Sequence, residues 1–551
     1  MRCSYHLMRL TGAALAVYLA QPEIAFGQSL DGTEHRLPPP PALRDEPAVA
    51  PPALEAAQAP QPEKTAEFAP LTLTAVVIRG ATVFEASEFA ALYDPYLARR
   101  VTLADLASIA DAITNKYRQA GYFLSRAVIP PQSIEGGLVR IEIIEGYIDT
   151  ITLEGAPNRK AKDIGVAALR DRPIKLAQLE RAILLINDLN GVTVSKSALY
   201  PDANDLRRHT MVLTLEGQDA QARLYLDNRG TGDVGRLQMY LQGGLHSIVR
   251  AADMLTGGLF FTPSAPRELL FGQIAYSAPL GDDGLTVTVY GARSAVHPDR
   301  APPLQSESHS IHSLIRLSYP IVRNRRLSLW GNVGFETRNV REDQPDAIVY
   351  KDRLRDVTLS AYAIARHGGG ASTAYAELVN GVSGSQPDGA PRSRADADGR
   401  FTKARFELTR SQRLHEHIET YVAVSGQISN DALLSSEEFA FGGVRYGRGF
   451  DPAAITGDDG VAGVVELRFL GEADWAKISS YQIFTFYDAG ALWNKDSSLG
   501  QYSLSSAGVG VRLVFDRNLQ LTYEAARPID GFSGTLSDER WRHFFSFSKA
   551  F

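Results

Sequence analysis

The C-terminal part of the chain alternates between apolar and polar residues, and this pattern constrains the fold more than any other feature. From about residue 221 to the end, short alternating segments follow one another without helical spacing; residues 285–290 and 519–524 are clear examples. A period of two places apolar side chains on one face of a strand and polar side chains on the other. About sixteen such segments can be counted, and an even number is what a closed bacterial up-and-down barrel requires.

This alternation leaves two folds open for residues 221–551. If the polar face lines a lumen and the apolar face meets lipid, the segment is a transmembrane β-barrel of an outer membrane. The rival is a large soluble β-sandwich or propeller. Beyond the N-terminal leader the sequence has no apolar run of about 18 residues, the length that a membrane-spanning helix needs. The barrel is therefore the fold that we expect.

The first 27 residues are typical of a secretory signal peptide. Arg2 and Arg9 supply positive charge, residues 10–20 form a short apolar core, and a small-x-small cleavage site ends at Gly27. The only cysteine of the chain is Cys3. We therefore expect an exported protein that has no disulfide and no thiolate metal site after cleavage.

Composition and motif searches give no support for an enzyme. The formal net charge is −6, so there is no basic excess that would indicate nucleic-acid binding. The eleven histidines include His415 and His417, but no pair has metal-ligand spacing together with a carboxylate on a helix. The Ser-His alternation over residues 308–313 is typical of polar positions in a lumen or loop. The sequence thus predicts no catalytic residue, no metal and no cofactor.

Residues 28–217 divide into a linker and two small domains. Residues 28–70 are rich in proline, alanine and charge, which predicts a disordered tether; whether this tether plugs a pore stays open. Residues 71–147 and 148–217 each predict a β-α-α-β-β unit, an internal repeat of architecture rather than of sequence. The expected elements are strands at 73–81, 123–129, 139–145, 148–154, 192–199 and 211–216, and helices at 85–96, 103–120 (after the N-cap Thr102, with Asp105 at its third position), 161–169 and 176–189.

Three dipeptides within residues 119–148 carry a family resemblance. They are Gly121-Tyr122, Pro131-Gln132 and Glu145-Gly146. Their order and spacing resemble the first POTRA domain of two-partner-secretion transporters, which belong to the haemolysin and filamentous-haemagglutinin secretion/activation family. The resemblance implies a periplasmic domain pair that receives an unfolded client at its strand edges. An exposed sheet edge is physically suited to that role.

The end of the sequence also resembles a known signal. Aromatic residues share one parity in the final segment: Trp541, Phe545, Phe547 and Phe551. His543 and Lys549 interrupt that parity. A last strand of this kind, ending on Phe551, resembles the signal by which the barrel-assembly machinery recognises its substrates. The alternative is an ordinary edge strand that ends on phenylalanine by chance.

A long glycine-rich loop at residues 439–460 is the candidate functional element. Hairpin loops of this length are more often functional or disordered than plain connectors. The loop follows the eleventh alternating segment, so it is the sixth extracellular loop if the chain enters the barrel from the periplasm. It contains Arg448, and the thirteenth segment contains Asp488, which should face the lumen because a carboxylate is costly on the lipid face. The two can meet only if the loop folds back into the barrel, where a charge-assisted pair would hold it.

The residues around these two charges resemble paired family motifs. Arg448-Gly449-Phe450 resembles the (V/I)-R-G-(F/Y) loop motif of two-partner-secretion transporters and their barrel-insertase relatives, and Phe486-x-Asp488-x-Gly490 resembles its partner on the thirteenth strand. Gly447 departs from the usual valine or isoleucine, which we expect to weaken the hydrophobic anchor of the motif. Arg445 could mimic the motif out of register. The simpler interpretation is a glycine-rich surface loop beside a solvated aspartate.

Residues 226–236 also resemble the family's first hairpin, so the resemblance covers residues 71–551. It implies a monomeric outer-membrane pore that secretes a large β-helical exoprotein, with surface folding supplying direction and the loop acting as gate or clamp. The rivals are a barrel-assembly-type insertase, which normally carries more POTRA domains, and a passive porin or solute channel. A barrel hydrolase would need a Ser-His-Asn constellation that cannot be assembled here. The client's identity, and whether it is activated as well as exported, stay open.

Overall fold

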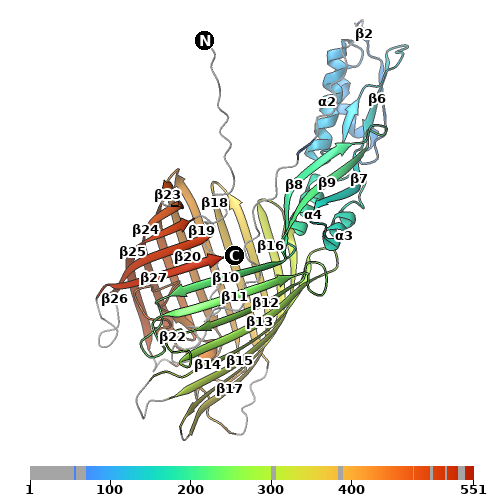
Figure 1. Cartoon of the computed structure of the whole chain (residues 1–551). Helices are drawn as coiled ribbons and strands as arrows, with labels where there is room; N and C mark the ends of the chain where they lie inside the picture. Colours follow the sequence, from blue (N-terminus) through green and yellow to red (C-terminus); the bar gives the residue numbers. More distant parts are fainter. Residues whose placement is uncertain are drawn as a thin grey trace, which may run out of the picture. The chain divides into compact units, whose positions relative to one another are not determined.

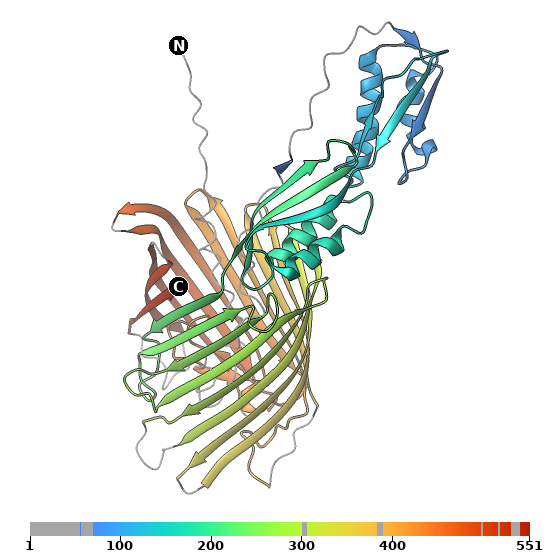
Figure 2. The same cartoon turned by 45° about the vertical axis from the view of Figure 1, so that its right-hand side comes forward.

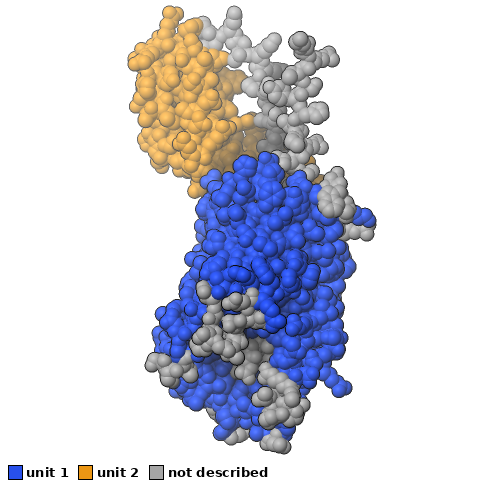
Figure 3. All heavy atoms as spheres, turned by 90° about the vertical axis from the view of Figure 1, so that its left-hand side faces the viewer, with its two compact units in different colours: residues 1–46, 218–551 blue, residues 47–217 orange. Residues whose placement is uncertain are grey.

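The structure is a computed structural model that describes residues 55–56, 70–299, 306–345, 347–382, 389–475, 477–496, 500–515, 518–530 and 540–551. The chain forms two compact units, one containing residues 218–551 and the other residues 47–217 (Figure 3). The signal peptide expected at 1–27 lies outside the described residues. No helix in the described part of the chain is long and apolar enough to cross a membrane.

The larger unit is a closed antiparallel barrel, and its tilted strands form one continuous wall (Figures 1 and 2). Its sixteen strands pair in chain order, which confirms the expected number and fold. They are β10 (Ala220–Asp227), β11 (Gln238–His246), β12 (Met254–Phe261), β13 (Leu269–Leu280), β14 (Leu285–Val296), β15 (Glu307–Arg323), β16 (Leu327–Gln344), β17 (Ala347–His367), β18 (Gly370–Gly381), β19 (Thr402–His415), β20 (Ile418–Ser429), β23 (Asp459–Trp475), β24 (Ile478–Trp493), β25 (Gln501–Phe515), β26 (Leu519–Asp530) and β27 (Arg542–Ala550).

Burial alternates along these strands as the sequence predicted. On β15, Ile311 and Ile315 are 51% and 54% exposed on the outer face, whereas Ser308 and Ser310 are buried inside. Apolar side chains outside and polar side chains inside match a lipid-facing wall around a polar lumen. The side chains of the Ser-His run at 308–313 do not all point into the lumen. His309 has the same parity as Ile311 and therefore lies on the outer face of β15.

The barrel closes where its last strand meets its first. β27 pairs antiparallel with β10 from Arg223↔Ala550 to Asp227↔Ser546. The Asn228 side chain extends this seam, since its amide donates to the His543 carbonyl at 3.0 Å and accepts from the Phe545 amide at 2.8 Å. Phe545 is 57% exposed on the outer face of β27.

The smaller unit contains two domains of the same topology, as expected from the repeat. In the first, β3 (Ala75–Arg79) runs parallel to β6 (Leu138–Ile144), and β5 (Arg126–Val128) pairs with β6 antiparallel. In the second, β7 (Tyr147–Gly155) runs parallel to β9 (Arg208–Gly217), and β8 (Val192–Pro201) pairs with β9 antiparallel. The main helices are α2 (Leu103–Gln119), α3 (Arg159–Ala168) and α4 (Leu176–Asn187).

Helix α2 organises the core of the first domain. Thr102 caps its N-terminus: Thr102 Oγ1 accepts from the Asp105 amide at 3.3 Å, and the Asp105 carboxylate accepts from the Thr102 amide at 2.7 Å. This is the expected capping box. The buried face of α2 follows the expected helical spacing and consists of Leu106, Ile109, Ile113 and Tyr117.

Two expected elements of the first domain differ in the structure. The helix expected at 85–96 is three short pieces, namely η2 (Ala86–Phe89), α1 (Ala90–Tyr93) and η3 (Asp94–Tyr96). Pro95 lacks a backbone N–H, so it cannot continue the α-helical ladder. The strand expected at 123–129 shortens to β5, because residues 121–125 form a turn closed by a hydrogen bond from the Ser125 amide to the Tyr122 carbonyl.

Short strands complete the smaller unit. β2 (Leu71–Thr72) pairs with β4 (Arg100–Val101). Within the expected linker at 28–70, Glu55 and Ala56 form β1 and pair in parallel with β8. The disorder expected there therefore does not extend to these two residues, and, apart from Pro70, the rest of that segment lies outside the described residues.

Candidate functional site

The loop between β20 and β23 folds back into the barrel. It contains a 3-10 turn, η4 (Ser435–Glu437), and a small antiparallel hairpin of β21 (Phe439–Phe441) and β22 (Ile455–Gly457). Phe441 and Phe450 of this inserted loop are 0% and 4% exposed. They form one buried cluster with lumen-facing residues of the wall, including Val464 on β23 and Leu492 on β24. The loop is thus packed inside the barrel, as the sequence analysis expected.

The tip of the inserted loop carries Arg448, which meets Asp488 on β24. The guanidinium donates through Nε to Asp488 Oδ2 at 3.1 Å and through its terminal nitrogen to Oδ1 at 2.8 Å. The Arg448 backbone amide also donates to Oδ2 at 2.9 Å. Arg448 is 3% exposed and Asp488 0%. The pair predicted from the sequence is therefore a fully buried, two-pronged ion pair, the strongest form of such a contact.

Arg448 contacts more than one carboxylate. Its second terminal nitrogen donates to Glu466 on β23 at 2.5 Å and lies 3.8 Å from Glu524 on β26. Its guanidinium carbon also lies 3.5 Å from the centre of the Phe486 ring. A cation over an aromatic face gains further stabilisation when it is desolvated. The loop tip is therefore fixed against three neighbouring strands and not against β24 alone.

The carboxylates around Arg448 are balanced by further buried arginines. Glu466 accepts from Arg468 at 2.7 Å and lies 3.5 Å from Arg512. Glu524 pairs with Arg229 from the loop after β10. Since isolated buried charges are very costly, this alternation of sign makes the cluster stable in a low-dielectric interior.

The remaining motif residues provide close packing. The Gly449 amide donates to Ser506 Oγ at 3.2 Å, and a Cβ added at Gly449 would lie 2.8 Å from Ser506 Cβ on β25. A Cβ at Gly490 would lie 2.2 Å from the Phe441 ring. Both glycines thus let the loop approach the wall more closely than any other residue would allow.

Gly447 is required by the local structure. Its φ is +78°, and an added Cβ would lie 2.5 Å from the Phe441 ring. The left-handed backbone favours glycine, and the phenylalanine ring occupies the space of a larger side chain. The hydrophobic anchor that we expected Gly447 to weaken is supplied by Phe441.

The base of the inserted loop has a second buried ion pair. Glu437 accepts from Lys403 on β19 at 2.7 Å and lies 3.4 Å from Arg338 on β16. Lys403 is 1% exposed and Glu437 4%. Gln427 on β20 donates to the Glu437 carbonyl at 2.9 Å. The base is therefore anchored by an anion of the loop and cations of the wall.

The loop between β18 and β19 also contacts the inserted loop. Arg394 donates to Glu438 and to Asp458 at 2.6 Å each. Asp458 is fully buried and additionally accepts from the amides of Leu433 and Lys495 at 2.7 Å each. Two extracellular loops are thus joined through one carboxylate.

Arg445, the alternative motif arginine, has a different partner. Its guanidinium pairs with Glu407 on β19, and Tyr446 lies 3.5 Å from the same carboxylate. Arg445 therefore does not compete with Arg448 for Asp488. It adds an independent contact between the loop and the wall.

The dipeptides of the first domain stabilise its fold and its junction with the second. Glu145 accepts from the amides of Thr82 and Val83 at 2.8 and 3.1 Å and from the Tyr117 hydroxyl at 2.7 Å. Burial, followed by the hydrogen bond to Glu145, raises the pKa of Tyr117 well above its usual range. The Gln132 side chain accepts from the Arg140 amide and donates to its carbonyl, both at 2.8 Å, as a neighbouring strand would.

The two glycines of these dipeptides lie at the junction of the domains. The Gly121 carbonyl accepts from the Leu176 amide at 2.9 Å, and the Gly146 carbonyl accepts from the Ile174 amide at 3.4 Å. The Tyr122 ring lies 5.1 Å from Lys175 Nζ. Pro131 precedes Gln132 in an exposed turn. Gly121, Tyr122 and Gly146 therefore hold the two domains together, whereas Gln132 and Glu145 make their contacts within the first domain.

Sequence reasoning missed three members of the buried cluster. Glu466 on β23 and Glu524 on β26 both point into the lumen. A charged residue at an inward-facing position of a strand was the available signal for them. Arg229 lies within the 226–236 stretch that resembled a first hairpin. Which charges would meet depended on strand register, which the alternating pattern does not fix.

The fold and the site together define a class of protein. A closed sixteen-stranded barrel preceded by two domains of this topology, with an arginine-bearing loop inside, is an outer-membrane transporter of the POTRA-plus-barrel type. Residues 71–146 match the model for a POTRA domain, ShlB-type, and residues 213–513 match the model for the haemolysin secretion/activation protein ShlB/FhaC/HecB. The chain belongs to this haemolysin secretion/activation family.

Individual relatives and solved structures are similar to this chain. The heme/hemopexin transporter protein HuxB of Haemophilus influenzae strain 86-028NP is 23% identical, over 84% of each chain. The solved structure of CdiB from Escherichia coli has a TM-score of 0.72 at 20% identity, covering 90% of this chain and 93% of that one. BamA from Haemophilus ducreyi lacking POTRA domains 1–3 has a TM-score of 0.50 at 12% identity, covering 88% of this chain and all of that one.

The family identifies the protein as a two-partner-secretion transporter of the Gram-negative outer membrane, with its POTRA domains in the periplasm. It translocates a secreted exoprotein through the barrel. The transporter interpretation of the sequence is therefore confirmed over the insertase, porin and soluble-fold alternatives.

Proposed function

We propose that the inserted loop is a permanent clamp on one side of the pore and that the client passes along the other side. The observation that carries this proposal is the buried contact of Arg448 with carboxylates of three strands. Withdrawing the loop would separate buried ion pairs at both its tip and its base, and each broken pair costs roughly 3–5 kcal/mol. The ion pairs of the loop reach β16, β19, β23, β24, β26 and β27, so the side formed by β11–β15 is the expected path.

A disulfide between the loop tip and the wall tests the clamp. The only cysteine of the sequence is Cys3, so Cys3→Ser gives a cysteine-free background for Gly449→Cys with Ser506→Cys. The Cβ separation of 2.8 Å is below the roughly 3.5–4.5 Å of a disulfide, and the new Cβ also lies 2.8 Å from the Arg527 carbonyl carbon and 2.9 Å from the Pro528 nitrogen, so the loop tip must shift by about 1 Å. The reduced double variant must therefore secrete, as the control, before the oxidised form is compared with it. The clamp predicts that the oxidised, crosslinked protein still secretes. Secretion that stops on oxidation and returns on reduction would mean that the loop is a gate.

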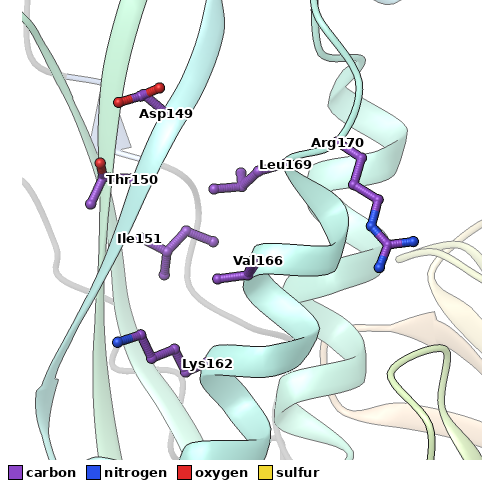
Figure 4. Close-up of a pocket in the computed structure, with 7 residues that line it drawn as sticks. All are labelled: Asp149, Thr150, Ile151, Lys162, Val166, Leu169 and Arg170. Atoms are coloured by element: carbon purple, nitrogen blue, oxygen red, sulfur yellow. The ribbon is translucent and has the colours of Figure 1, made fainter.

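We also propose that the client first binds beside β7 of the second domain. Among the described residues β7 pairs only with β9, so its other edge has free backbone groups. A pocket of about 360 Å³ lies between β7 and α3, where Ile151 points toward Val166 and Leu169 (Figure 4). An extended segment could add a strand to this edge and place an apolar side chain in the pocket.

Val166 is the residue with which to test this binding groove. It is 52% exposed, so Val166→Asp should fold while placing a carboxylate beside the apolar side chains of Ile151 and Leu169. We expect several-fold weaker secretion of the client exoprotein, and weaker crosslinking of its N-terminal segment to the second domain. The matched control is Val249→Asp, at a 76% exposed valine in the turn between β11 and β12. Equal secretion by both variants would contradict the groove.

The remaining features of the transporter are proposed from its family. Translocation needs no enzymatic step of its own, since folding of a large β-helical client at the cell surface would supply direction. The barrel-assembly machinery would insert the protein as a monomer, using the outward aromatic face of β27 and Phe551. The decisive experiment is co-expression with a large secreted β-helical protein encoded beside this chain, if there is one: export that persists when this chain is deleted would overturn the transporter assignment.

A further inference from the structure

Two histidines and a glutamate meet at the end of the β14–β15 hairpin. His297 directly follows β14, Glu307 begins β15, and His309 lies two residues further along β15. The register pairs Val296 with Ser308, so His297 lies beside Glu307 across the two strands. His309 shares the outward parity of Ile311, whereas Ser308 and Ser310 face the lumen. The cluster therefore lies on the outer surface of the barrel, away from the inserted loop.

The three side chains converge on one point. His297 Nε2 is 3.5 Å and His309 Nε2 is 3.9 Å from Glu307 Oε2, and the three ligand atoms lie within 4.8 Å of one another. A tetrahedral zinc ion with bonds of about 2.0–2.1 Å has ligand atoms about 3.4 Å apart. Small side-chain rotations would bring the three atoms to that spacing.

Direct hydrogen bonds do not explain the arrangement. Separations of 3.5 and 3.9 Å exceed the usual range of about 2.7–3.2 Å for a nitrogen donor and an oxygen acceptor. The Nδ1 atoms of both imidazoles are inaccessible to solvent and have no hydrogen-bond partner in the described part of the chain. The Nε2 atoms of both rings thus lie near one carboxylate at separations longer than a hydrogen bond and close to the ligand spacing around a metal ion.

We propose that His297, Glu307 and His309 bind a divalent transition metal, with zinc as the best fit. Imidazole nitrogen with carboxylate oxygen suits zinc, nickel and copper, whereas calcium and magnesium prefer oxygen ligands alone. β14 is the fifth strand of a barrel entered from the periplasm, so it ends at the cell surface. The metal would exchange directly with the medium and tie together the ends of two neighbouring strands, with its fourth position open to water.

The sequence predicts no metal site because it has no pair of histidines at metal-ligand spacing with a carboxylate on a helix. Here the ligands are separated by a loop and brought together by antiparallel pairing, with His309 opposite Ala295. Strand register, rather than local spacing, creates the cluster. The proposal stands independently of the function of the inserted loop.

The test is zinc binding by the full-length protein, purified without a histidine tag in chelator-treated detergent. Isothermal titration with zinc chloride should show one site per chain. His297→Ala and His309→Ala should each weaken binding at least tenfold, and Glu307→Gln should weaken it several-fold. Cobalt should give visible absorption bands in the wild type that both histidine variants lose.

A matched control uses the two histidines at the other end of the barrel. His415 and His417 flank the turn between β19 and β20, and the double variant His415→Ala/His417→Ala should bind zinc like the wild type. Heat-modifiable migration on gels checks that each variant is a folded barrel. The proposal would be overturned if the wild-type protein bound no zinc or if His309→Ala still bound it like the wild type. Loss of binding in the His415→Ala/His417→Ala variant alone would also overturn it.

Discussion

The tip and the base of the inserted loop are both held by buried ion pairs, but the signs are opposite. At the tip the loop contributes a cation, Arg448, and the wall contributes the carboxylates of Asp488 and Glu466. At the base the loop contributes an anion, Glu437, and the wall contributes Lys403 and Arg338. Each end would be repelled by the other end's site.

This reversal of charge fixes the depth and direction of the loop. A loop with the same charge at both ends could slide along the wall and exchange one site for the other. With opposite charges, any such slip would bury like charges together, which costs several kcal/mol. The two anchors together therefore specify one position of the inserted loop along the wall, which neither anchor could do alone.

The largest effect is expected at the tip. Arg448→Ala leaves Asp488 buried without its cation and removes one of the three arginines around Glu466, at a cost of roughly 3–5 kcal/mol. We expect exoprotein secretion to fall at least tenfold while the barrel still inserts, because strand pairing is untouched. Secretion assays and heat-modifiability measure the two effects. Wild-type secretion by this variant would show that the tip anchor has no functional role.

A charge exchange at the base should have the next largest effect. Glu437→Lys places a third cation beside Lys403 and Arg338, so we expect several-fold weaker secretion and faster proteolysis of the loop. The double variant Glu437→Lys/Lys403→Glu restores one opposite-charge pair and should recover part of the loss. A double variant no better than the single one would show that charge is not what fixes the base.

A smaller effect is expected from the residue that the family usually carries. Gly447→Val introduces a branched side chain at a φ of +78° against the Phe441 ring. Secretion should drop by a few-fold, and the loss should be smaller than for Arg448→Ala. The matched control is Gly232→Val, where an added side chain meets open space. An unchanged rate for Gly447→Val would mean that Phe441 can move aside.

The smallest effect is expected at the contact between the two extracellular loops. Arg394→Ala removes a cation from Asp458, which keeps its hydrogen bonds from the Leu433 and Lys495 amides. We expect secretion within about twofold of wild type and faster cleavage of the surface loops by added protease. A loss as large as that of Arg448→Ala would place a third essential anchor at this loop.

Much of this architecture could be predicted from the sequence because its signals are local. Alternation identified the barrel strands, the capping residues Thr102 and Asp105 located helix α2, and inward parity assigned Asp488 to the lumen. The ion pair of Arg448 with Asp488 could be predicted because a long loop carrying an arginine and a carboxylate facing the lumen left few other pairings.

What could not be predicted depended on register or on conformation. Glu466 and Glu524 meet Arg448, and Arg229 meets Glu524, only because strands far apart in sequence pair in one alignment. The role of Gly447 depended on a positive φ and on the position of the Phe441 ring, neither of which is visible in composition. The ion pairs of Glu437 could not be predicted because they depend on how deeply the loop inserts into the barrel.

The seam between β10 and β27 has a kinetic consequence. Asn228 and His543 are bonded across it although 315 residues separate them in the chain. Closing a loop of that length costs roughly 5 kcal/mol in chain entropy. The seam offsets this cost with only a short ladder of strand pairing between β10 and β27. Contacts between such distant segments are expected to form last. Amides of this seam should therefore be the latest of the barrel to gain protection during assembly.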